Sequence, residues 1–185
     1  ALRRRYPDGQ LTYVVEAAAA PVIRGNRNVT DIVVVPRTGG MTRVRDDLAL
    51  ARRLRRQHFD IAIDLHGGPR AAWLTWSSGA PVRIGYRIQG RSWMYTHVVP
   101  RPRDEAPRPS VVNQSDLLAP LGLELPDPVL DPLEMAVDAT ASASVDRRLK
   151  GAGISAAHPI VVIHVSAGNP FRRWPPASFE ALVVA

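Results

Sequence analysis

The sequence predicts an α/β protein built on a doubly wound parallel sheet. Short apolar segments alternate with segments of helical pattern along much of the chain, as expected of repeated βαβ units. One of the apolar segments, Ile32–Val35, is a continuous run that ends at Pro36, which is typical of a strand buried on both faces. The segment that follows, residues 41–58, carries an apolar stripe at helical spacing.

The elements before this strand can be assigned in order. Residues 2–6 have the pattern of the last turn of a helix, and Pro7-Asp8-Gly9 predicts a turn. Residues 10–15 are rich in β-branched and aromatic residues and predict a strand. The Ala-rich residues 17–24 predict a helix that ends at Gly25-Asn26. Because a single helical turn is unstable alone, we interpret the chain as a fragment cut at both ends.

The elements after Pro36 continue the alternation. In the helix predicted at residues 41–58, four apolar side chains follow one another along one face: Val44, Leu48, Ala51 and Leu54. The arginines beside that stripe are expected to be a solvated face. Strands are predicted at residues 59–65 and 82–86, with a helix at 70–77 between them. Residues 87–109 are expected to be irregular.

A second domain is expected to begin in the last third of the chain. Helices are predicted at residues 111–121 and 140–150, with a proline-rich stretch between them. Residues 160–165 then predict a strand, followed by a loop and a helix. The expected parts are a Rossmann-like domain lacking its first strand (1–125), a linker with a connecting helix (126–158), and the first strand, loop and helix of a second Rossmann-like domain (159–185).

The composition excludes several classes of protein. The chain has 185 residues and a net charge of +7, and it contains no cysteine. It therefore has no disulfide framework, no thiolate metal site and no cysteine nucleophile. It shows neither an apolar run long enough to span a membrane nor a signal peptide. Lys150 is its single lysine, and such a basic balance is compatible with nucleic acid, a membrane surface or an anionic substrate.

The segment after the strand predicted at residues 160–165 has the chemistry of a phosphate-binding loop. Small residues come first, then two arginines, then a helix that begins with prolines. Small residues let backbone N–H groups approach an anion, and a helix N-terminus and arginines favour its negative charge. The candidate residues are Ser166, Ala167, Gly168, Arg172 and Arg173. The alternative is an ordinary loop with solvated arginines; the spacing matches neither a dinucleotide fingerprint nor a P-loop.

Two further segments carry candidate side chains. Asp64, His66 and Arg70 follow the strand predicted at residues 59–65, and they suggest an acid/base pair, a ligand site or a hydrogen-bonded structural pair. Two metal-ligating residues without a third predict no metal. Arginines alternate with aromatic residues from Arg83 to Trp93, a pattern that suits an anionic sugar, a nucleic acid or a solvated loop anchored by its aromatic rings.

Taken together, the motifs resemble those of glycosyltransferase family 9, the heptosyltransferases of the lipopolysaccharide inner core. The resemblance is carried by four stretches, in chain order: Leu2–Asp8, Phe59–Gly67, Arg83–Tyr86, and His164–Gly168 with Arg172–Pro175. It implies a GT-B fold, in which two Rossmann-like domains face each other across a cleft. It further implies inverting, metal-independent transfer of heptose from ADP-heptose to a lipid A-core acceptor, with no cofactor.

The resemblance also implies roles for the candidate residues. The loop from Ser166 to Arg173 would contact the donor pyrophosphate, and Arg70 and Arg91 fall in regions that contact acidic groups of the acceptor. Asp64 and His66 are grouped with them as acceptor-binding candidates. Arg172 stands where the family often has lysine. The aspartate that acts as general base in the family would precede Ala1, so no catalytic residue is assigned here and the fragment is expected to be inactive alone.

Other readings remain open at the level of the sequence. The first alternative is a family 9 transferase with another donor or acceptor, and the second is a non-catalytic remnant of that family. A third, from a different class, is an Arg-rich nucleic-acid-binding module. The expected partners are a nucleotide-sugar donor and a lipid A-core acceptor, and we expect no nucleic acid. For a heptosyltransferase, the expected location is the cytoplasm, in peripheral contact with the inner face of the inner membrane.

Overall fold

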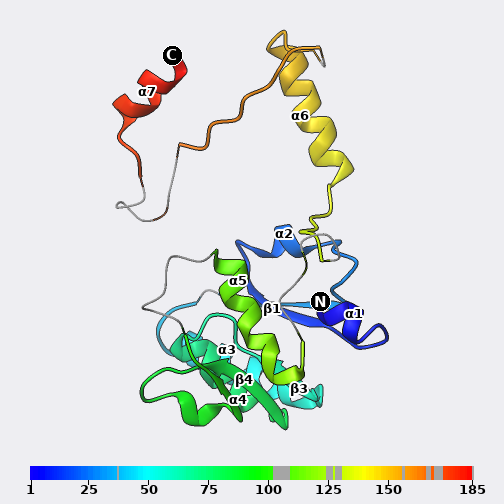
Figure 1. The fold of residues 1–185 in the computed structure, drawn as a ribbon, viewed down its shortest axis with the longest axis vertical. Helices are drawn as coiled ribbons and strands as arrows, with labels where there is room; N and C mark the ends of the chain where they lie inside the picture. The colour runs from blue at the N-terminus through cyan, green and yellow to red at the C-terminus, as the bar shows by residue number, and fades with distance from the viewer. Residues whose placement is uncertain are drawn as a thin grey trace. The chain divides into compact units, whose positions relative to one another are not determined.

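A computed structural model describes residues 1–36, 38–101, 109–123, 127, 131–155, 157–165, 168 and 173–184. The chain divides into two compact units, Ala1–Ala136 and Val137–Ala185, and each is described by itself (Figure 1). The domain limits expected at residues 125 and 158 stay predictions.

The first unit contains five strands and the helices that connect them, as far as its residues are described. In chain order the elements are α1 (Leu2–Arg5), β1 (Thr12–Glu16), α2 (Ala20–Ile23), β2 (Asp31–Val35), α3 (Gly40–Arg56), β3 (Ile61–Ile63), α4 (Pro69–Ser77), β4 (Val82–Tyr86), the 3₁₀ helix η1 (Ser92–Met94), β5 (His97–Val99), α5 (Ser110–Ser115) and the 3₁₀ helix η2 (Asp116–Leu121). The strands alternate with helices, as the sequence predicts.

All strand pairs in this unit are parallel, which confirms the predicted fold class. The pair β1 and β2 forms one sheet, in which Val14 lies opposite Val33. A second sheet has the order β3, β4, β5, in which Ile61 pairs with Val82 and Ile84 with His97. The orders β2–β1 and β3–β4–β5 are those of a doubly wound sheet with order 3-2-1-4-5-6 when its first strand is left out.

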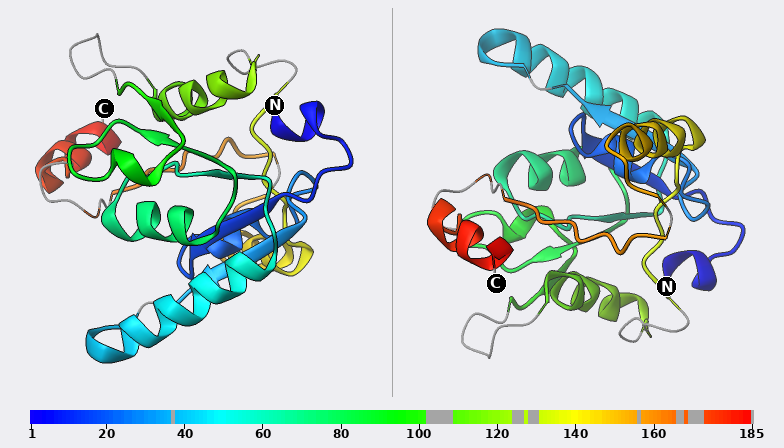
Figure 2. Two further views of the ribbon diagram at one scale, coloured as in Figure 1. Left: turned by 90° about the horizontal axis from the view of Figure 1, so that it is seen from below. Right: turned by 90° about the horizontal axis from the view of Figure 1, so that it is seen from above.

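Helices cover both faces of the strands (Figure 2). On one side, α3 and α4 pack against β2 in a cluster of buried side chains formed by Val33, Val35, Leu50, Ala51, Leu54 and Leu74. On the other side, η2 contributes the fully buried Leu117 to a second cluster with Ile84, Tyr86 and Val99 of β4 and β5. The apolar stripe predicted for α3 is therefore only half covered: Ala51 and Leu54 are buried, whereas Val44 and Leu48 are exposed.

The structure also departs from the sequence predictions in two places. Strand β5 lies within residues 87–109, which were expected to be irregular, because three residues before Pro100 carry too little pattern to indicate a strand. The strand predicted at residues 160–165 is wrong for this structure, in which that segment is not a strand. Its apolar side chains are exposed, Val161 by 83% and Val162 by 87%, because no neighbouring strand pairs with it among the described residues.

The second unit contains two helices in its described part. Helix α6 (Ala139–Gly151) begins at Asp138, whose carboxylate accepts hydrogen bonds from the backbone N–H groups of Thr140 and Ala141. Helix α7 (Pro176–Val184) follows Trp174, whose ring packs edge-to-face against Phe179 with centroids 5.1 Å apart. In the described parts of both units, no helix is long and apolar enough to cross a membrane.

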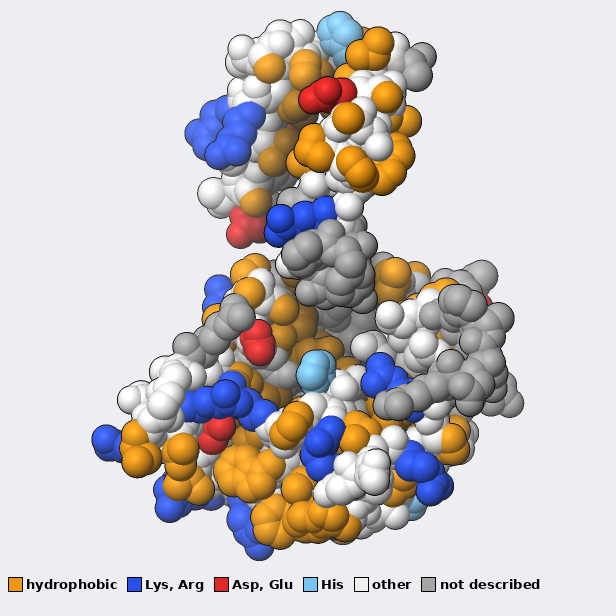
Figure 3. Space-filling model, turned by 90° about the vertical axis from the view of Figure 1, so that its left-hand side faces the viewer, with side chains coloured by type: hydrophobic (Ala, Val, Ile, Leu, Met, Phe, Trp, Pro, Cys, Tyr) orange, Lys and Arg blue, Asp and Glu red, His pale blue; other side chains and the backbone are white. Residues whose placement is uncertain are grey.

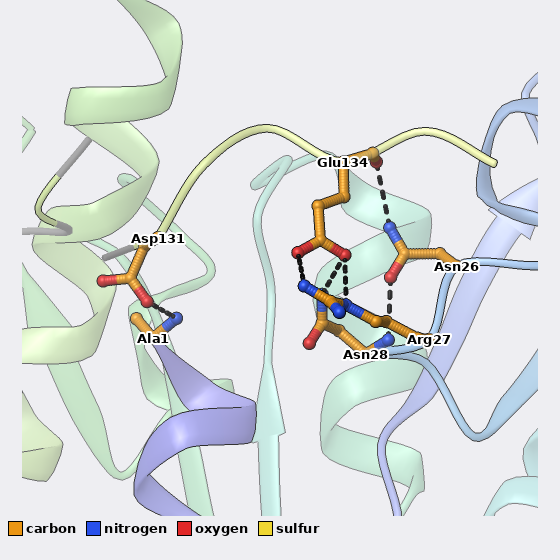
Figure 4. A network of polar contacts seen from close by, with 6 residues as sticks. All are labelled: Ala1, Asn26, Arg27, Asn28, Asp131 and Glu134. Carbon is orange, nitrogen blue, oxygen red and sulfur yellow. Dashed lines mark hydrogen bonds and ion pairs between the residues drawn. The ribbon is translucent and has the colours of Figure 1, made fainter. Parts of the chain in front are cut away.

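Polar contacts tie the segment before α6 to the first residues of the chain and to the loop between α2 and β2 (Figure 4). The Glu134 carboxylate accepts hydrogen bonds from Nε and Nη2 of Arg27, at 2.9 and 2.7 Å, and from Nδ2 of Asn28. The backbone carbonyl of Glu134 accepts a further bond from Asn26. A second carboxylate, that of Asp131, pairs with the amino group of Ala1 and with Arg4. These contacts all lie within the first unit.

We expect the Glu134 contact to be lost in acid. The hydrogen bond from Arg27 is the main reason that the pKa of Glu134 is lowered from its ordinary value of 4.5. A lowered pKa means that the contact is fully present above pH 4.5 and is lost as the pH falls through the lowered value. In Glu134→Gln, the amide NMR signals of Asn26 and Asn28 should be shifted already at neutral pH. Unshifted signals in that variant would show that the contact does not form.

Candidate functional site

The Asp64 carboxylate organises the loop at the carboxyl end of β3. It is buried, with 3% of the residue exposed. One oxygen, Oδ1, accepts hydrogen bonds from the backbone N–H groups of His66 (2.9 Å) and Gly67 (2.8 Å). The other, Oδ2, accepts a bond of 2.7 Å from the Tyr95 hydroxyl. The resulting turn requires a left-handed conformation at Gly67, with φ of 74°, which glycine adopts without strain.

Tyr95 reaches Asp64 because β4 has no side chain in its path. Gly85 lies in β4, and a Cβ atom built at that position would be 2.5 Å from Cε1 and 2.6 Å from Cε2 of the Tyr95 ring. Tyr95 itself is buried, so the ring has no room to move aside. A glycine inside a strand often marks such a close approach, and Gly85 is the sequence signal that could have revealed this contact.

The loop places His66 and Arg91 at the carboxyl edge of β3 and β4. The His66 ring is exposed, and its Nδ1 accepts a hydrogen bond of 3.1 Å from the backbone N–H of Gly68. In the neutral ring this leaves the proton on Nε2, which is then available as a donor. Nη2 of Arg91 lies 3.5 Å from the carbonyl oxygen of Gly67. The structure therefore brings Asp64, His66 and Arg91 together around one loop.

Arg70 is turned toward the carboxyl end of β2. Its Nε donates a hydrogen bond of 2.9 Å to Oδ1 of Asp47 on α3, and its Nη2 contacts the same oxygen. Nη2 also donates to the carbonyl oxygen of Pro36 at 3.2 Å. The guanidinium therefore links α4 and α3 to the end of β2. Arg70 follows His66 by four residues in the sequence.

The environment of Tyr95 makes the stability of this region depend on pH in the alkaline range. Burial is the main cause that raises the pKa of Tyr95 well above its ordinary value of 10, and the hydrogen bond and charge of Asp64 raise it further. Arg91 opposes this rise, because a positive charge favours the tyrosinate. A raised pKa means that the stabilisation is fully present below pH 10 and is lost as the pH rises above it.

We therefore expect alkaline destabilisation that depends on Tyr95. The free energy of unfolding of the chain should decrease above pH about 10, and this decrease should be smaller in Tyr95→Phe, which has no ionisable hydroxyl. The measurement is urea unfolding across the alkaline range. An unchanged alkaline decrease in Tyr95→Phe would assign it to the other tyrosines.

The predicted phosphate-binding loop is only partly described. Ser166, Ala167 and Arg172 lie outside the described residues, whereas Gly168 and Arg173 lie within them. Arg173 is exposed and stands three residues before Pro176, the first residue of α7. The order of loop and helix in the sequence is therefore present, but the structure does not test phosphate binding.

The segment from Arg83 to Trp93 separates into buried and exposed parts. Tyr86 is buried, its hydroxyl donates a hydrogen bond of 2.5 Å to the carbonyl oxygen of Asn113, and Arg101 lies over its ring at 5.2 Å. Trp93 is instead 62% exposed. Of the three alternatives for this segment, the one in which both rings anchor a solvated loop agrees with the buried Tyr86 but not with the exposed Trp93.

Other features of the described residues do not add to this site. A pocket of about 400 Å³ is lined by residues between Ile23 and Val34, at the end of α2 and along β2. It lies away from Asp64 and His66 in sequence and is open to solvent. Among the described residues, no group of three or more His, Asp or Glu side chains is placed to hold a metal ion.

Comparison with solved structures identifies the class of fold. The crystal structure of a glycosyl transferase family 9 protein from Veillonella parvula DSM 2008 matches with a TM-score of 0.82 and 21% identity, over 98% of this chain and 51% of that chain. The structure of E. coli ADP-heptose lps heptosyltransferase II matches with a TM-score of 0.68 and 19% identity, over 99% and 54%. The chain has the α/β fold of these GT-B-type glycosyltransferases, and it spans about half the length of either.

The family follows from the sequence itself. The family model for glycosyltransferase family 9 (heptosyltransferase) matches residues 48–185, which is most of the chain. The chain belongs to glycosyltransferase family 9. A search of curated proteins gives no match.

Proposed function

We propose that this chain is part of an inverting, metal-independent glycosyltransferase that moves a heptose from ADP-heptose to the lipopolysaccharide inner core. Family membership over residues 48–185 supports glycosyl transfer in general. Of the solved structures, the E. coli protein is named for ADP-heptose and lipopolysaccharide. The chain would supply the acceptor side and the beginning of the donor side, and the parent protein would supply the rest.

The observation that carries the acceptor assignment is the loop held by Asp64. Ligands of parallel α/β sheets bind beyond the carboxyl ends of the strands, where His66 and Arg91 lie. An imidazole Nε2–H on an exposed side chain and a guanidinium are donors suited to the phosphate and carboxylate groups of a lipid A-core acceptor. In this proposal Asp64 acts through the loop, because three donors already occupy its carboxylate.

Arg70 would extend the acceptor site toward β2. Two of its nitrogens contact Asp47 and Pro36, so the guanidinium is held in a fixed orientation. A fixed guanidinium can bind an oxyanion through a remaining N–H without a further loss of side-chain entropy.

On the donor side, the proposed pyrophosphate site is the loop before α7. Ser166, Ala167 and Gly168 would offer backbone N–H groups, and Arg172 and Arg173 would neutralise the charge that develops on the departing ADP. In the reaction, an acceptor hydroxyl oxygen attacks the anomeric carbon of heptose while the bond to the pyrophosphate oxygen breaks. A base from the parent protein takes the hydroxyl proton, since we assign no catalytic residue within this chain.

A transfer assay with mass detection tests this function. The full-length parent should join heptose from ADP-heptose to a lipid A-core acceptor, and the 185-residue chain should not. Transfer from another nucleotide-sugar only would replace the proposed donor, and absence of transfer from every donor would favour a non-catalytic remnant. Transfer by the chain alone would refute the view that its base lies elsewhere. The proposed site of action is the cytoplasmic face of the inner membrane.

A further inference from the structure

Two tryptophans form an exposed pair on the surface of the first unit. Trp76 on α4 is 44% exposed and Trp93 on η1 is 62% exposed. Their rings meet edge-to-face, with centroids 5.7 Å apart and planes at 70°. Exposing two large aromatic rings side by side leaves apolar surface in water that a folded protein usually buries.

The two elements that carry the pair are joined by the partly buried Arg83. The Arg83 guanidinium donates hydrogen bonds to the carbonyl oxygens of Ala80 (2.6 Å), which follows α4, and Met94 (2.9 Å) in η1. This clamp joins the two elements that carry the tryptophans. Nε1 of Trp93 also donates to the carbonyl oxygen of Gly90 at 3.2 Å. The aromatic surface is therefore formed before any partner arrives.

A basic cluster at the carboxyl end of α3 comes close to the end of α4, the helix that carries Trp76. Helices α3 and α4 pack side by side, and a Cβ atom on Gly79 would lie 3.5 Å from Cζ of Arg55. The backbone N–H of Gly79 in turn donates a hydrogen bond of 3.2 Å to the carbonyl oxygen of Trp76. Arg55 therefore reaches the end of the helix that carries Trp76.

The cluster lacks acidic partners. Residues 52–58 contain four arginines and no acidic residue. Of the four, Arg53 lies 3.8 Å from Asp31. Across the described part of the chain, no acidic side chain lies within ion-pair distance of the other three, Arg52, Arg55 and Arg56, all of which are exposed. Figure 3 shows a face of this unit on which apolar and basic side chains adjoin.

We propose that Trp76, Trp93, Arg52, Arg55 and Arg56 form a docking surface for an anionic lipid bilayer. Tryptophan rings are favoured at the boundary between lipid headgroups and hydrocarbon, and arginines bind anionic headgroups. Stacking of nucleic-acid bases needs open ring faces, whereas the edge-to-face contact places the edge of one ring against the face of the other. The choice of a membrane also agrees with the proposed lipid-borne acceptor.

Vesicle binding by the 185-residue chain tests this surface. With vesicles of phosphatidylglycerol and phosphatidylcholine in equal parts, we expect co-sedimentation that weakens with salt, and tryptophan emission that shifts to the blue. Changing Arg52, Arg55 and Arg56 together to Gln should weaken partitioning about fivefold for each arginine, on the order of a hundredfold in all. Trp76→Ala with Trp93→Ala should abolish the blue shift.

The matched control changes three cations elsewhere. Replacing Arg147, Arg148 and Lys150 on α6 with Gln alters the net charge equally, and it should leave most of the binding intact. Equal losses in both triple variants, or no binding to anionic vesicles, would overturn the proposal. Binding of a single-stranded oligonucleotide through the same residues, without vesicle binding, would assign the surface to nucleic acid. Because no donor or acceptor sugar is present, this result is independent of the transfer assay.

Discussion

Replacing Asp64 with alanine should lower the free energy of unfolding by about 4 kcal/mol. The change removes the acceptor of three hydrogen bonds, from the backbone N–H groups of His66 and Gly67 and from the Tyr95 hydroxyl. Each donor left unpaired in a buried place costs about 1–3 kcal/mol, and partial relaxation of the loop recovers some of the sum. Such a loss is a large part of the 5–15 kcal/mol that is typical of a folded domain.

Asp64→Asn is the matched control for this prediction. Its amide oxygen can still accept from the two backbone N–H groups, so the loss should be about 1–2 kcal/mol. Urea unfolding measures both variants. In Asp64→Ala the amide NMR signals of His66 and Gly67 should also move or broaden under native conditions, because the turn loses its acceptor. If Asp64→Ala proved as stable as Asp64→Asn, the carboxylate would not be the group that holds the loop.

Gly85→Ala is expected to have the second largest effect, about 3 kcal/mol of destabilisation. The new Cβ would overlap the Tyr95 ring, which is buried and fixed at its hydroxyl by Asp64. The ring must shift, so the variant combines overpacking with a weakened hydrogen bond to a charged group. The entropy gained by removing a glycine from the unfolded chain offsets less than about 1 kcal/mol.

A double-mutant cycle separates this clash from other effects of Gly85. In a Tyr95→Leu background the smaller side chain leaves room for the Cβ, so Gly85→Ala should cost much less there. Gly151→Ala serves as a control, because apart from the neighbouring backbone of α6 no atom lies within 4 Å of the Cβ position at Gly151. It should leave stability unchanged or raise it. The same cost of Gly85→Ala in both backgrounds would exclude the Tyr95 ring as its cause.

The sequence predicted those parts of the fold in which local pattern and tertiary packing agree. Helix α3 and strand β2 have strong periodic or continuous apolar patterns, and the structure confirms both. Residues 160–165 have an equally apolar pattern, yet a strand needs a neighbour to accept its hydrogen bonds, and the described residues provide none. A pattern of this kind therefore indicates what a segment would do beside a partner strand.

The position of the candidate site can be predicted from the sequence, but the role of each of its residues cannot. The glycines at the end of β3 predict the loop, and their residue types make Asp64 and His66 candidates. That Asp64 is buried under three donors, while His66 is exposed, depends on Tyr95, which lies 31 residues later in the chain. The contact of Arg70 with Asp47 likewise joins two helices. Such long-range pairings leave only indirect signals in one sequence, such as Gly85.

The central claim is that the loop held by Asp64 forms part of a site for an acidic sugar acceptor. An NMR titration of the ¹⁵N-labelled chain with Kdo (3-deoxy-D-manno-octulosonic acid), an acidic sugar of the kind proposed for the acceptor, tests it most directly. The account predicts saturable shifts at the amides of His66, Gly67 and Arg91, and weaker binding in Arg91→Gln. Shifts confined to the pocket between Ile23 and Val34, or an unchanged affinity in Arg91→Gln, would contradict it.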